Sequence, residues 1–457
     1  MTLATSFFQD DDFIQAMYIV AFTLFILGLR GVTSPKTARR GNVTAAVGMA
    51  VAVIATLLIP EVGDYGLIAV GVAIGTAIGV PAARSVQMTQ MPQMVALFNG
   101  VGGGAVALIA WAEFRKSGGD LPLEEGVPIL FAAIIGSISF WGSNIAFGKL
   151  QEILPGRPIQ LPGQQFVNGA LLLIAIACAV AIAAGSEAEL LFLVILVAAA
   201  LLGNMFVLPI GGADMPVVIS LLNAFTGLSA AAAGIALDNT ALIVGGILVG
   251  ASGSILTNLM AEAMSRSIPA IVAGGFGGVD LTSGSGEDGR PVRSTDASDA
   301  AIQLAYARRV VVTPGYGMAV AQAQHAVREM AAELEKRGVE VVYAIHPVAG
   351  RMPGHMNVLL AEADVPYEQL KEMDDINPEL PQIDVALVIG ANDTVNPEAG
   401  MPIIDVQRCG QVIILKRSMS AGFAGIDNPL FYNENTALLF GDAKESVAKV
   451  TGEVQEL

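Results

Sequence analysis

Charged residues are scarce in this sequence, at 14% of 457 residues, whereas 54% of the residues are hydrophobic. Soluble globular domains usually carry about a quarter charged residues, so this scarcity indicates a membrane protein. The charges that are present are mainly acidic, with 41 Asp and Glu against 24 Lys and Arg and a formal net charge of −17. Nucleic-acid binding requires a basic face, so a nucleic-acid partner is not expected.

Cysteine and histidine are rarer still. The two cysteines, Cys178 and Cys409, lie far apart in the sequence, and such a pair predicts neither a disulfide framework nor a metal site. All three histidines (His325, His346 and His355) occur in the last third of the chain. The polar groups inside the apolar part are therefore amides and hydroxyls.

Long apolar runs fill the first 266 residues. Nine of them reach the roughly 17–25 residues that an α-helix needs to cross a bilayer. They lie near residues 13–29, 42–60, 66–83, 93–112, 127–147, 166–185, 189–208, 216–236 and 240–261. Residues 1–266 are therefore predicted to form a polytopic α-helical membrane domain with about nine transmembrane helices.

Basic residues occur mainly in alternate loops, and in membrane proteins such loops face the cytoplasm. The loops assigned to that side hold Arg30, Lys36, Arg39, Arg40, Arg84, Lys149, Arg157 and Arg266. The other side has only Arg115 and Lys116. With nine spans, the N-terminus is expected outside and the C-terminal region in the cytoplasm.

After Pro269 the composition changes to Gly, Ser and Asp, which is typical of a flexible linker, and residues 267–305 are assigned to it. Residues 306–457 then alternate between strand and helix patterns, which predicts a soluble, doubly wound, Rossmann-like α/β domain. The expected strands are 309–313, 339–345, 384–389, 411–416 and 436–440. The expected helices are 317–337, 354–363 and 442–454.

The first of these strands ends in a glycine turn. Gly315, Gly317 and Val320 occupy the three small-residue positions of a dinucleotide-binding turn, in which glycines let the backbone approach a pyrophosphate at a helix N-terminus. A glycine turn between strand and helix is also ordinary α/β structure, so this motif alone is weak.

The choice of nucleotide depends on the ends of other strands. An NAD site usually has an acid at the end of its second strand, but here that strand ends in His346, with Arg351 close behind. Lys416, Arg417 and Ser418 follow another strand and suit a 2′-phosphate, which favours NADP. Asp393 follows the strand at 384–389 and is expected near the same crevice. The alternatives are that Lys416 and Arg417 form a solvated basic pair and that Asp393 forms a turn.

Polar residues recur at one depth of the apolar runs. Asn99, Ser139, Asn223 and Ser252 lie in one layer of the cytoplasmic half, and Ser143 lies nearer the surface. Such a layer predicts a hydrated proton path. The alternative is hydrogen bonding between helices that pack through small residues.

Several longer stretches resemble a known family. "TPGYGMAVAQAQ", "IHPVAGRMPGHMNVLLAEA", "LVIGANDTVNP" and "KRSMSAGFAGIDNPLF" resemble the NADP(H)-binding domain of proton-translocating NAD(P) transhydrogenase. "MTQMP", "FWGSNIAFGKLQ", "GGADMPVVISLLNAF" and "AGGFG" resemble its membrane domain. The match covers nearly the whole chain, which is similar to the family's beta subunit.

The resemblance implies a reaction and partners. Hydride would pass between NADP(H) on this chain and NAD(H) on a partner, coupled to proton movement across the membrane. The partner would be an alpha subunit that carries the NAD(H)-binding domain and further transmembrane helices. The whole assembly would be a dimer in the lipid bilayer of the bacterial inner membrane.

The resemblance also implies residue roles. Around the pyrophosphate and adjoining ribose it places Gly315, Tyr316, Gly317, Met318 and Val320, and in the same crevice Val348, Ala349, Gly350 and Arg351. Close to the nicotinamide it places Gly390, Ala391, Asn392, Asp393 and Thr394. At the 2′-phosphate it places Lys416, Arg417 and Ser418, and in a closing loop Gly422, Phe423 and Gly425. Further cofactor contacts would come from Asp442 and Ala443.

Protonation would be coupled to cofactor binding by Asp393 and His346. Asp214 would lie where the membrane and nucleotide domains meet, although an acid at a helix N-terminus is equally expected there. The sequence departs from the family pattern at Asn99, where many members have a histidine, and at Phe423, where an aromatic hydroxyl is common. An amide does not titrate, so a titratable group is expected from a partner's membrane helix, with Asn99, Ser143 and Asn223 lining the path.

Two other classes compete with this interpretation. A channel or transporter gated by a nucleotide-sensing domain should show a carbonyl filter or charges inside its spans, and neither is evident. A membrane anchor for a soluble dehydrogenase would need one or two spans rather than nine.

Overall fold

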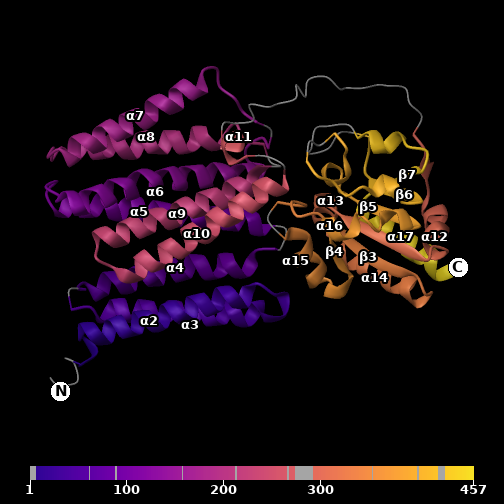
Figure 1. Ribbon diagram of the computed structural model, residues 1–457, viewed down its shortest axis with the longest axis horizontal. Helices are drawn as coiled ribbons and strands as arrows, with labels where there is room; N and C mark the ends of the chain where they lie inside the picture. The colour runs from indigo at the N-terminus through magenta and orange to yellow at the C-terminus, as the bar shows by residue number, and fades with distance from the viewer. Residues whose placement is uncertain are drawn as a thin grey trace.

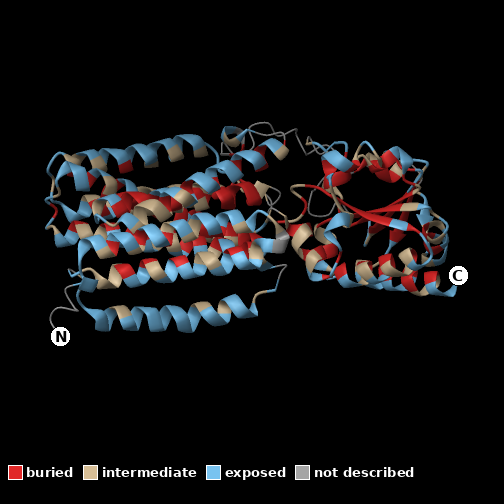
Figure 2. Ribbon diagram, turned by 60° about the horizontal axis from the view of Figure 1, so that its bottom comes forward, coloured by how far each residue is buried: buried red, intermediate tan, exposed pale blue. Residues whose placement is uncertain are grey.

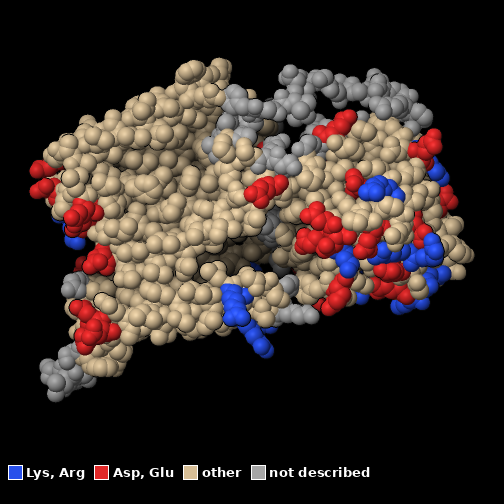
Figure 3. Space-filling view, in the orientation of Figure 1, with Lys and Arg blue, Asp and Glu red and all other residues tan. Residues whose placement is uncertain are grey.

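The protein consists of a helical bundle and an α/β domain that lie end to end (Figure 1). The computed structural model describes residues 7–60, 62–87, 90–156, 158–211, 214–264, 267–272, 292–351, 354–398, 401–419 and 428–457. Figure 3 shows that acidic and basic side chains gather on the α/β domain and at the ends of the bundle, while the flank of the bundle is almost uncharged.

The described residues include nine helices that are long and apolar enough to cross a membrane, which confirms the predicted spans. They are α2 (Asp11–Val32), α3 (Pro35–Leu58), α4 (Tyr65–Ser85), α5 (Met91–Lys116), α6 (Leu123–Leu150), α7 (Gln164–Ala183), α8 (Glu189–Val207), α9 (Met215–Ala236) and α10 (Thr240–Ala263). A short helix, α11 (Ile268–Val272), follows them.

The bundle is packed unevenly. Helices α6 and α9 lie at its centre and bury many residues, whereas α4 buries none (Figure 2). Central contacts depend on glycine: a Cβ on Gly246 of α10 would lie 2.4 Å from the backbone nitrogen of Ala231 in α9. Close approach of backbones is how helices associate in lipid, where apolar burial alone does not favour it.

The α/β domain is built on seven parallel strands in the order β1-β7-β6-β5-β2-β3-β4. They are β1 (Ser294–Thr295), β2 (Arg309–Pro314), β3 (Glu340–Ile345), β4 (Leu370–Glu372), β5 (Val385–Ile389), β6 (Gln411–Lys416) and β7 (Thr436–Phe440). The chain adds β3 and β4 on one side of β2 and then crosses to place β5 on the other side. The order therefore reverses between β2 and β5, as in dinucleotide-binding folds.

Alternate strand residues face two cores. Val310 and Val312 of β2 pack with α12 (Ala297–Ala305), α14 (Gln324–Lys336) and α17 (Ala443–Glu456), whereas Val311 packs with α16 (Met373–Ile376) on the opposite face. The sheet is covered on both sides, which confirms the predicted doubly wound α/β class. The remaining helices are α13 (Tyr316–Val320) and α15 (His355–Glu362).

Two sequence predictions need correction. The single helix predicted for 317–337 is two helices, because the chain turns at residues 321–323, where Gln322 has a left-handed φ of 49°. The assignment of all residues 267–305 to a linker is also wrong at its C-terminal end. There, β1 pairs with β7, and Leu304 of α12 is buried in the domain core.

Candidate functional site

The switch point of the sheet brings two loops together. Pro314 at the end of β2 is in register with Ile389 at the end of β5. The Gly315 N–H donates to the carbonyl of Ile389 over 2.9 Å, and the Gly317 N–H donates to the carbonyl of Gly390 over 3.0 Å. Ligands of open α/β sheets bind outside such a switch point, so this edge is the candidate cofactor site.

The glycines of these loops fit against one another. A Cβ on Gly317 would lie 2.7 Å from the Cα of Gly390, and one on Gly315 would lie 2.3 Å from the Cα of Ala391. Gly390 itself has a φ of 61°. Since α13 has only five residues, the turn differs from the long helix N-terminus that the sequence predicted. Close packing between the two loops is sufficient to explain both turn glycines.

His346 and Asp393 come together behind the switch point. The Nδ1 atom of His346 accepts from the Val348 N–H over 3.2 Å, so the ring is protonated at Nε2, which donates to the carbonyl of Pro402 over 2.7 Å. Burial lowers the pKa of His346 below its ordinary value, partly offset by the Pro402 carbonyl and by Asp393. Burial raises the pKa of Asp393, partly offset by its own backbone hydrogen bond and by His346. The two groups therefore influence each other's pKa, while their role in coupling stays a prediction.

The end of β6 supplies the basic groups. Lys416 ends the strand with its Nζ 4.0 Å from the centre of the Phe431 ring, and Arg417 and Ser418 follow it as exposed residues. Gly422, Phe423 and Gly425 lie outside the described residues. Just beyond them, the buried Asn428 donates through Nδ2 to the backbone carbonyl and the side-chain oxygen of Asn392. This link between the β5 and β6 loops was missed, since a lone Asn in a loop gives no sequence signal.

Other predicted cofactor residues differ in accessibility. The side chains of Met318 and Ala349 belong to the domain core, and Ala391 and Thr394 are also buried, so these four reach a ligand through backbone atoms only. Exposed or partly exposed positions are Tyr316, Val320, Gly350, Asn392, Asp442 and Ala443. Asp442 also caps α17 by accepting from the N–H groups of Lys444 and Glu445. The Met318 side chain therefore packs in the core, and its predicted place at the pyrophosphate concerns its backbone.

The loop after β3 contacts the membrane helices. The guanidinium of Arg351 donates to the carbonyl of Leu150, the last residue of α6, and to Glu152 just beyond it. Val348 packs against the buried cluster at this end of the bundle. Gln322 donates to Gln87, which precedes α5, over 3.2 Å. The candidate cofactor edge therefore faces the bundle, an orientation that the sequence did not reveal.

Inside the bundle, three predicted polar residues form one hydrogen-bonded chain. Asn99 of α5 donates through Nδ2 to Ser143 over 2.9 Å and to Ser139 over 3.4 Å, both in α6. The Ser139 hydroxyl lies 2.6 Å from that of Thr226 in α9. The Oδ1 atom of Asn99 is buried without a hydrogen-bond partner in the described part of the chain. The sequence did not predict a role for Thr226, because a single Thr among the apolar and small residues of α9 is common in membrane helices.

The other predicted path residues lie outside this chain of hydrogen bonds. Ser252 is exposed, and its hydroxyl donates to the carbonyl of Leu248 in its own helix. Asn223 is half-buried, and Asp214 directly precedes α9. Ser220 and Thr257, hydrogen-bonded over 3.0 Å, bridge α9 and α10. The bundle thus contains both a polar chain and hydroxyls that join helices.

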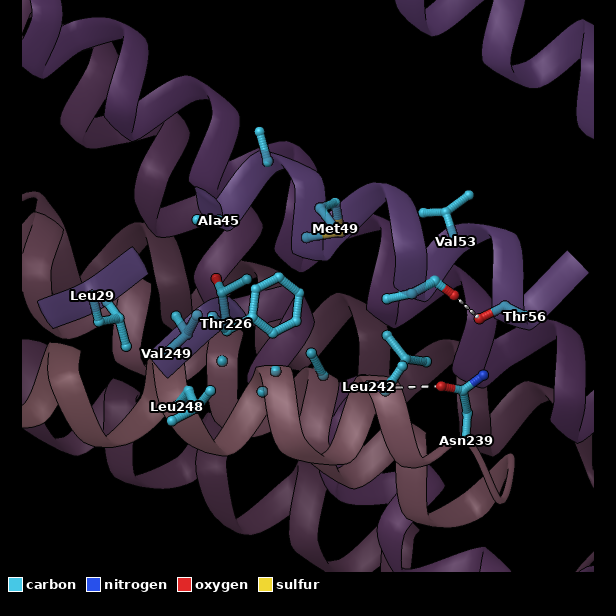
Figure 4. A pocket seen from close by; sticks show the side chains of 18 of the residues that line it. Leu29, Ala45, Met49, Val53, Thr56, Thr226, Asn239, Leu242, Leu248 and Val249 are labelled. Atoms are coloured by element: carbon cyan, nitrogen blue, oxygen red, sulfur yellow. Dashed lines mark hydrogen bonds between the residues drawn. The ribbon is translucent and has the colours of Figure 1, made fainter. Parts of the chain in front are cut away.

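An apolar groove of about 800 Å³ runs between α2, α3, α9 and α10. Figure 4 shows Ala45, Met49 and Val53 of α3 on one side of it and Leu248 and Val249 of α10 on the other. Its lining includes four polar residues, Thr56, Thr226, Asn239 and Ser252. The groove therefore reaches the polar chain through Thr226.

Comparison with known proteins gives a consistent result. A family model described as "NAD(P) transhydrogenase beta subunit" matches residues 14–453. The NAD(P) transhydrogenase subunit beta of Rhodospirillum rubrum is 47% identical, in an alignment that covers 95% of this chain and 98% of that protein. The same protein from a named strain of that species gives the same values.

Proposed function

Because the chain belongs to the family of NAD(P) transhydrogenase beta subunits, we propose that it binds NADP(H) at the carboxyl edge of its sheet. Hydride is exchanged there with NAD(H) held by an alpha subunit, and the exchange is coupled to proton movement through the bundle. The chain is a multi-pass membrane subunit of an enzyme that uses nicotinamide nucleotides.

The observation that carries this proposal is the composition of the switch-point edge. The loops after β2 and β5 meet there, while the neighbouring β6 ends at Lys416 and is followed by Arg417 and Ser418. A guanidinium, an ammonium and a hydroxyl fit the 2′-phosphate that distinguishes NADP(H) from NAD(H). The strand β3 is followed by His346 instead of the acid that would bind a free 2′-hydroxyl.

The bound nicotinamide supplies the hydride chemistry, and the protein supplies binding and orientation. The exposed Arg417 and Ser418 bind the 2′-phosphate together with Lys416. Backbone groups of residues 315–318, 348–351 and 390–394, with Asp442 and Ala443, shape the crevice. Gly422, Phe423 and Gly425, outside the described residues, are further proposed cofactor contacts. Asp393 and His346 hold a proton whose position depends on cofactor binding.

The polar chain of Asn99, Ser139, Ser143 and Thr226 is the proposed inner part of the proton path, with Asn223 and Asp214 closer to the α/β domain. None of the four titrates near neutral pH, so a membrane helix of the alpha subunit supplies the titratable group. The groove beside Thr226 is the place for that helix, and the buried Oδ1 of Asn99 offers an acceptor to a donor that arrives from it.

Proton movement is coupled to hydride exchange through a change in the affinity for NADP(H). Moving one charge through the membrane is worth about 2.3 kcal/mol per 100 mV, which corresponds to a roughly 50-fold change in a dissociation constant. The α/β domain lies at the bundle end that carries Arg30, Arg84 and Lys149 (Figure 1). By the distribution of basic residues, we assign this end to the cytoplasm and the N-terminus to the outside of the bacterial inner membrane, in a dimeric assembly.

Cofactor binding to the full chain in lipid nanodiscs tests the proposal. NADPH should bind much more tightly than NADH, and the double variant Lys416→Ala/Arg417→Ala should weaken NADPH binding about 100-fold without changing NADH binding. The double variant Lys444→Ala/Lys449→Ala removes two charges from exposed positions of α17 and serves as the control. Equal affinity for both cofactors, or none for either, would refute the assignment.

A further inference from the structure

Arg351 lies at the junction of the two domains. Its side chain is 3% exposed, and its Nη1 atom donates to the carbonyl of Leu150 over 2.6 Å. Its Nη2 atom lies 3.2 Å from a carboxylate oxygen of Glu152. Both acceptors belong to the bundle, at the end of α6 and just after it. Two nitrogens of a guanidinium from the loop after β3 therefore donate to membrane-domain oxygens.

The same guanidinium also contacts the candidate cofactor site. Its central carbon lies 4.2 Å from the centre of the Tyr316 ring, and Tyr316 stands between the two turn glycines, Gly315 and Gly317. Burial raises the pKa of Tyr316, while Arg351 opposes and Glu152 reinforces this shift. Arg351 thus lies between the glycine turn and the membrane domain and contacts both.

The membrane partners of Arg351 connect to the polar chain. The carbonyl of Leu150 also accepts from Nε2 of Gln93 in α5 over 3.2 Å. Helix α5 carries Asn99, and α6 carries Ser139 and Ser143. The carbonyls at the C-terminal end of a helix are partly negative and attract cations. This explains why the Arg351 guanidinium binds at the end of α6.

A guanidinium binds a carboxylate and a phosphate with the same planar arrangement of donors. We propose that Glu152 competes with the phosphates of the cofactor for Arg351, so that docking of the α/β domain on the bundle and tight NADP(H) binding oppose each other. This inference rests on the proposed function. In the docked arrangement, a carboxylate oxygen of Glu152 takes the position at Nη2 of Arg351 that a phosphate oxygen would take.

The effect must be reciprocal. If bound cofactor draws Arg351 from Glu152, it weakens docking by the same factor by which docking weakens cofactor binding. The side chain of Glu152 is 74% exposed, and ion pairs with an exposed partner are weak. Removing its charge should therefore change NADP(H) affinity by about two- to fivefold.

The test uses the full chain assembled with its alpha subunit in nanodiscs. Glu152→Gln keeps a side-chain acceptor but removes the charge. It should tighten NADPH binding about two- to fivefold, whereas Glu187→Gln, at an exposed loop position at the other end of the bundle, should leave it unchanged. Docking is followed by a short bis-maleimide reagent between Gln87→Cys and Gln322→Cys, whose side chains are in contact, after both native cysteines are replaced by alanine.

Addition of NADPH should lower the cross-linking yield in the wild-type background and lower it further with Glu152→Gln. The competition is wrong if NADPH binds but Glu152→Gln leaves its affinity unchanged or weakens it. It is equally wrong if saturating NADPH leaves the cross-linking yield unchanged. Absence of NADPH binding to the wild-type assembly would overturn the proposed function itself, and the inference with it.

Discussion

At the scale of single residues, the turn glycines are required by backbone contact. A methyl group on Gly317 would meet the backbone of Gly390 at 2.7 Å, and backbone cannot move aside as a flexible side chain can. Gly317→Ala should therefore destabilise the α/β domain by about 1–3 kcal/mol and weaken NADPH binding. Thermal unfolding of the full chain with and without NADPH measures both effects.

The control for this variant is Gly452→Ala. Gly452 lies inside α17 with nothing within 4 Å of an added Cβ. Alanine is favoured over glycine within a helix by about 1 kcal/mol, so this substitution should stabilise the domain slightly. A Gly317→Ala variant as stable as the wild type would contradict the loop contact.

His355 gives the domain a predictable pH dependence. Its Nδ1 atom accepts from the Arg351 N–H over 3.0 Å, and burial together with the Arg351 charge lowers its pKa from 6.5 to about 4. In the unfolded chain the histidine binds a proton near pH 6.5, whereas the folded chain resists protonation until about pH 4. Stability is therefore lost as the pH falls through this window, by about 2 kcal/mol between pH 7 and pH 5.

Replacement by asparagine tests this pH dependence. His355→Asn should lower the melting temperature at pH 7, because a packed ring is lost, but reduce its fall between pH 7 and pH 5. His325→Asn, at an exposed position of α14, should leave the fall unchanged. Since burial also lowers the pKa of His346, part of the pH dependence should persist. An undiminished fall in His355→Asn would exclude His355 as its source.

At the scale of elements, substitutions in the polar chain and at hydroxyls outside it should affect proton-coupled turnover differently. Asn99→Ala removes the donor that joins α5 to Ser143 and Ser139, so proton-coupled turnover in vesicles should fall at least about 10-fold, equivalent to the net worth of one hydrogen bond. Ser254→Ala should leave turnover unchanged, because the Ser254 hydroxyl donates within α10, to the carbonyl of Gly250, and Ser254 does not line the groove. Equal rates for both variants would favour a purely structural role for the polar layer.

The elements themselves could be predicted in part. Long apolar runs and continuously buried strands such as β5 and β6 have strong patterns. Most of their predicted bounds agree with the structure within a few residues, although α3 begins at Pro35, before the predicted start at residue 42. The two-residue β1 and three-residue β4 are too short for a pattern to register. The break at Gln322 was hidden by surrounding residues that favour helix, since a left-handed φ in a non-glycine residue depends on tertiary packing.

The candidate cofactor site could also be predicted only in part. Motif resemblance indicated the loops after β2, β5 and β6, and the sheet register brings the first two together. The contacts of Arg351 with Leu150 and Glu152 join residues about 200 positions apart. No local pattern encodes such a contact, so the engagement of a predicted cofactor residue by the bundle emerged only from the structure.

At the scale of the whole molecule, the bundle has surfaces that the described residues leave uncovered. The groove beside Thr226 and the helix α4, which buries none of its residues, both lie within the membrane-spanning part. Gly245 lines the groove, and nothing in the described structure lies within 4 Å of a Cβ added to it. A larger side chain at this position would occupy the groove without disturbing the chain itself.

Gly245→Leu should therefore block the proposed alpha-subunit helix. We expect normal NADPH binding to the purified chain, less alpha subunit recovered with it, and loss of proton-coupled turnover in the recovered complex. Gly169→Leu, at an equally open glycine of α7, should assemble and turn over normally. If Gly245→Leu assembled and turned over like Gly169→Leu, the partner helix would have to lie elsewhere, and the donor for Asn99 would have to reach it by another route.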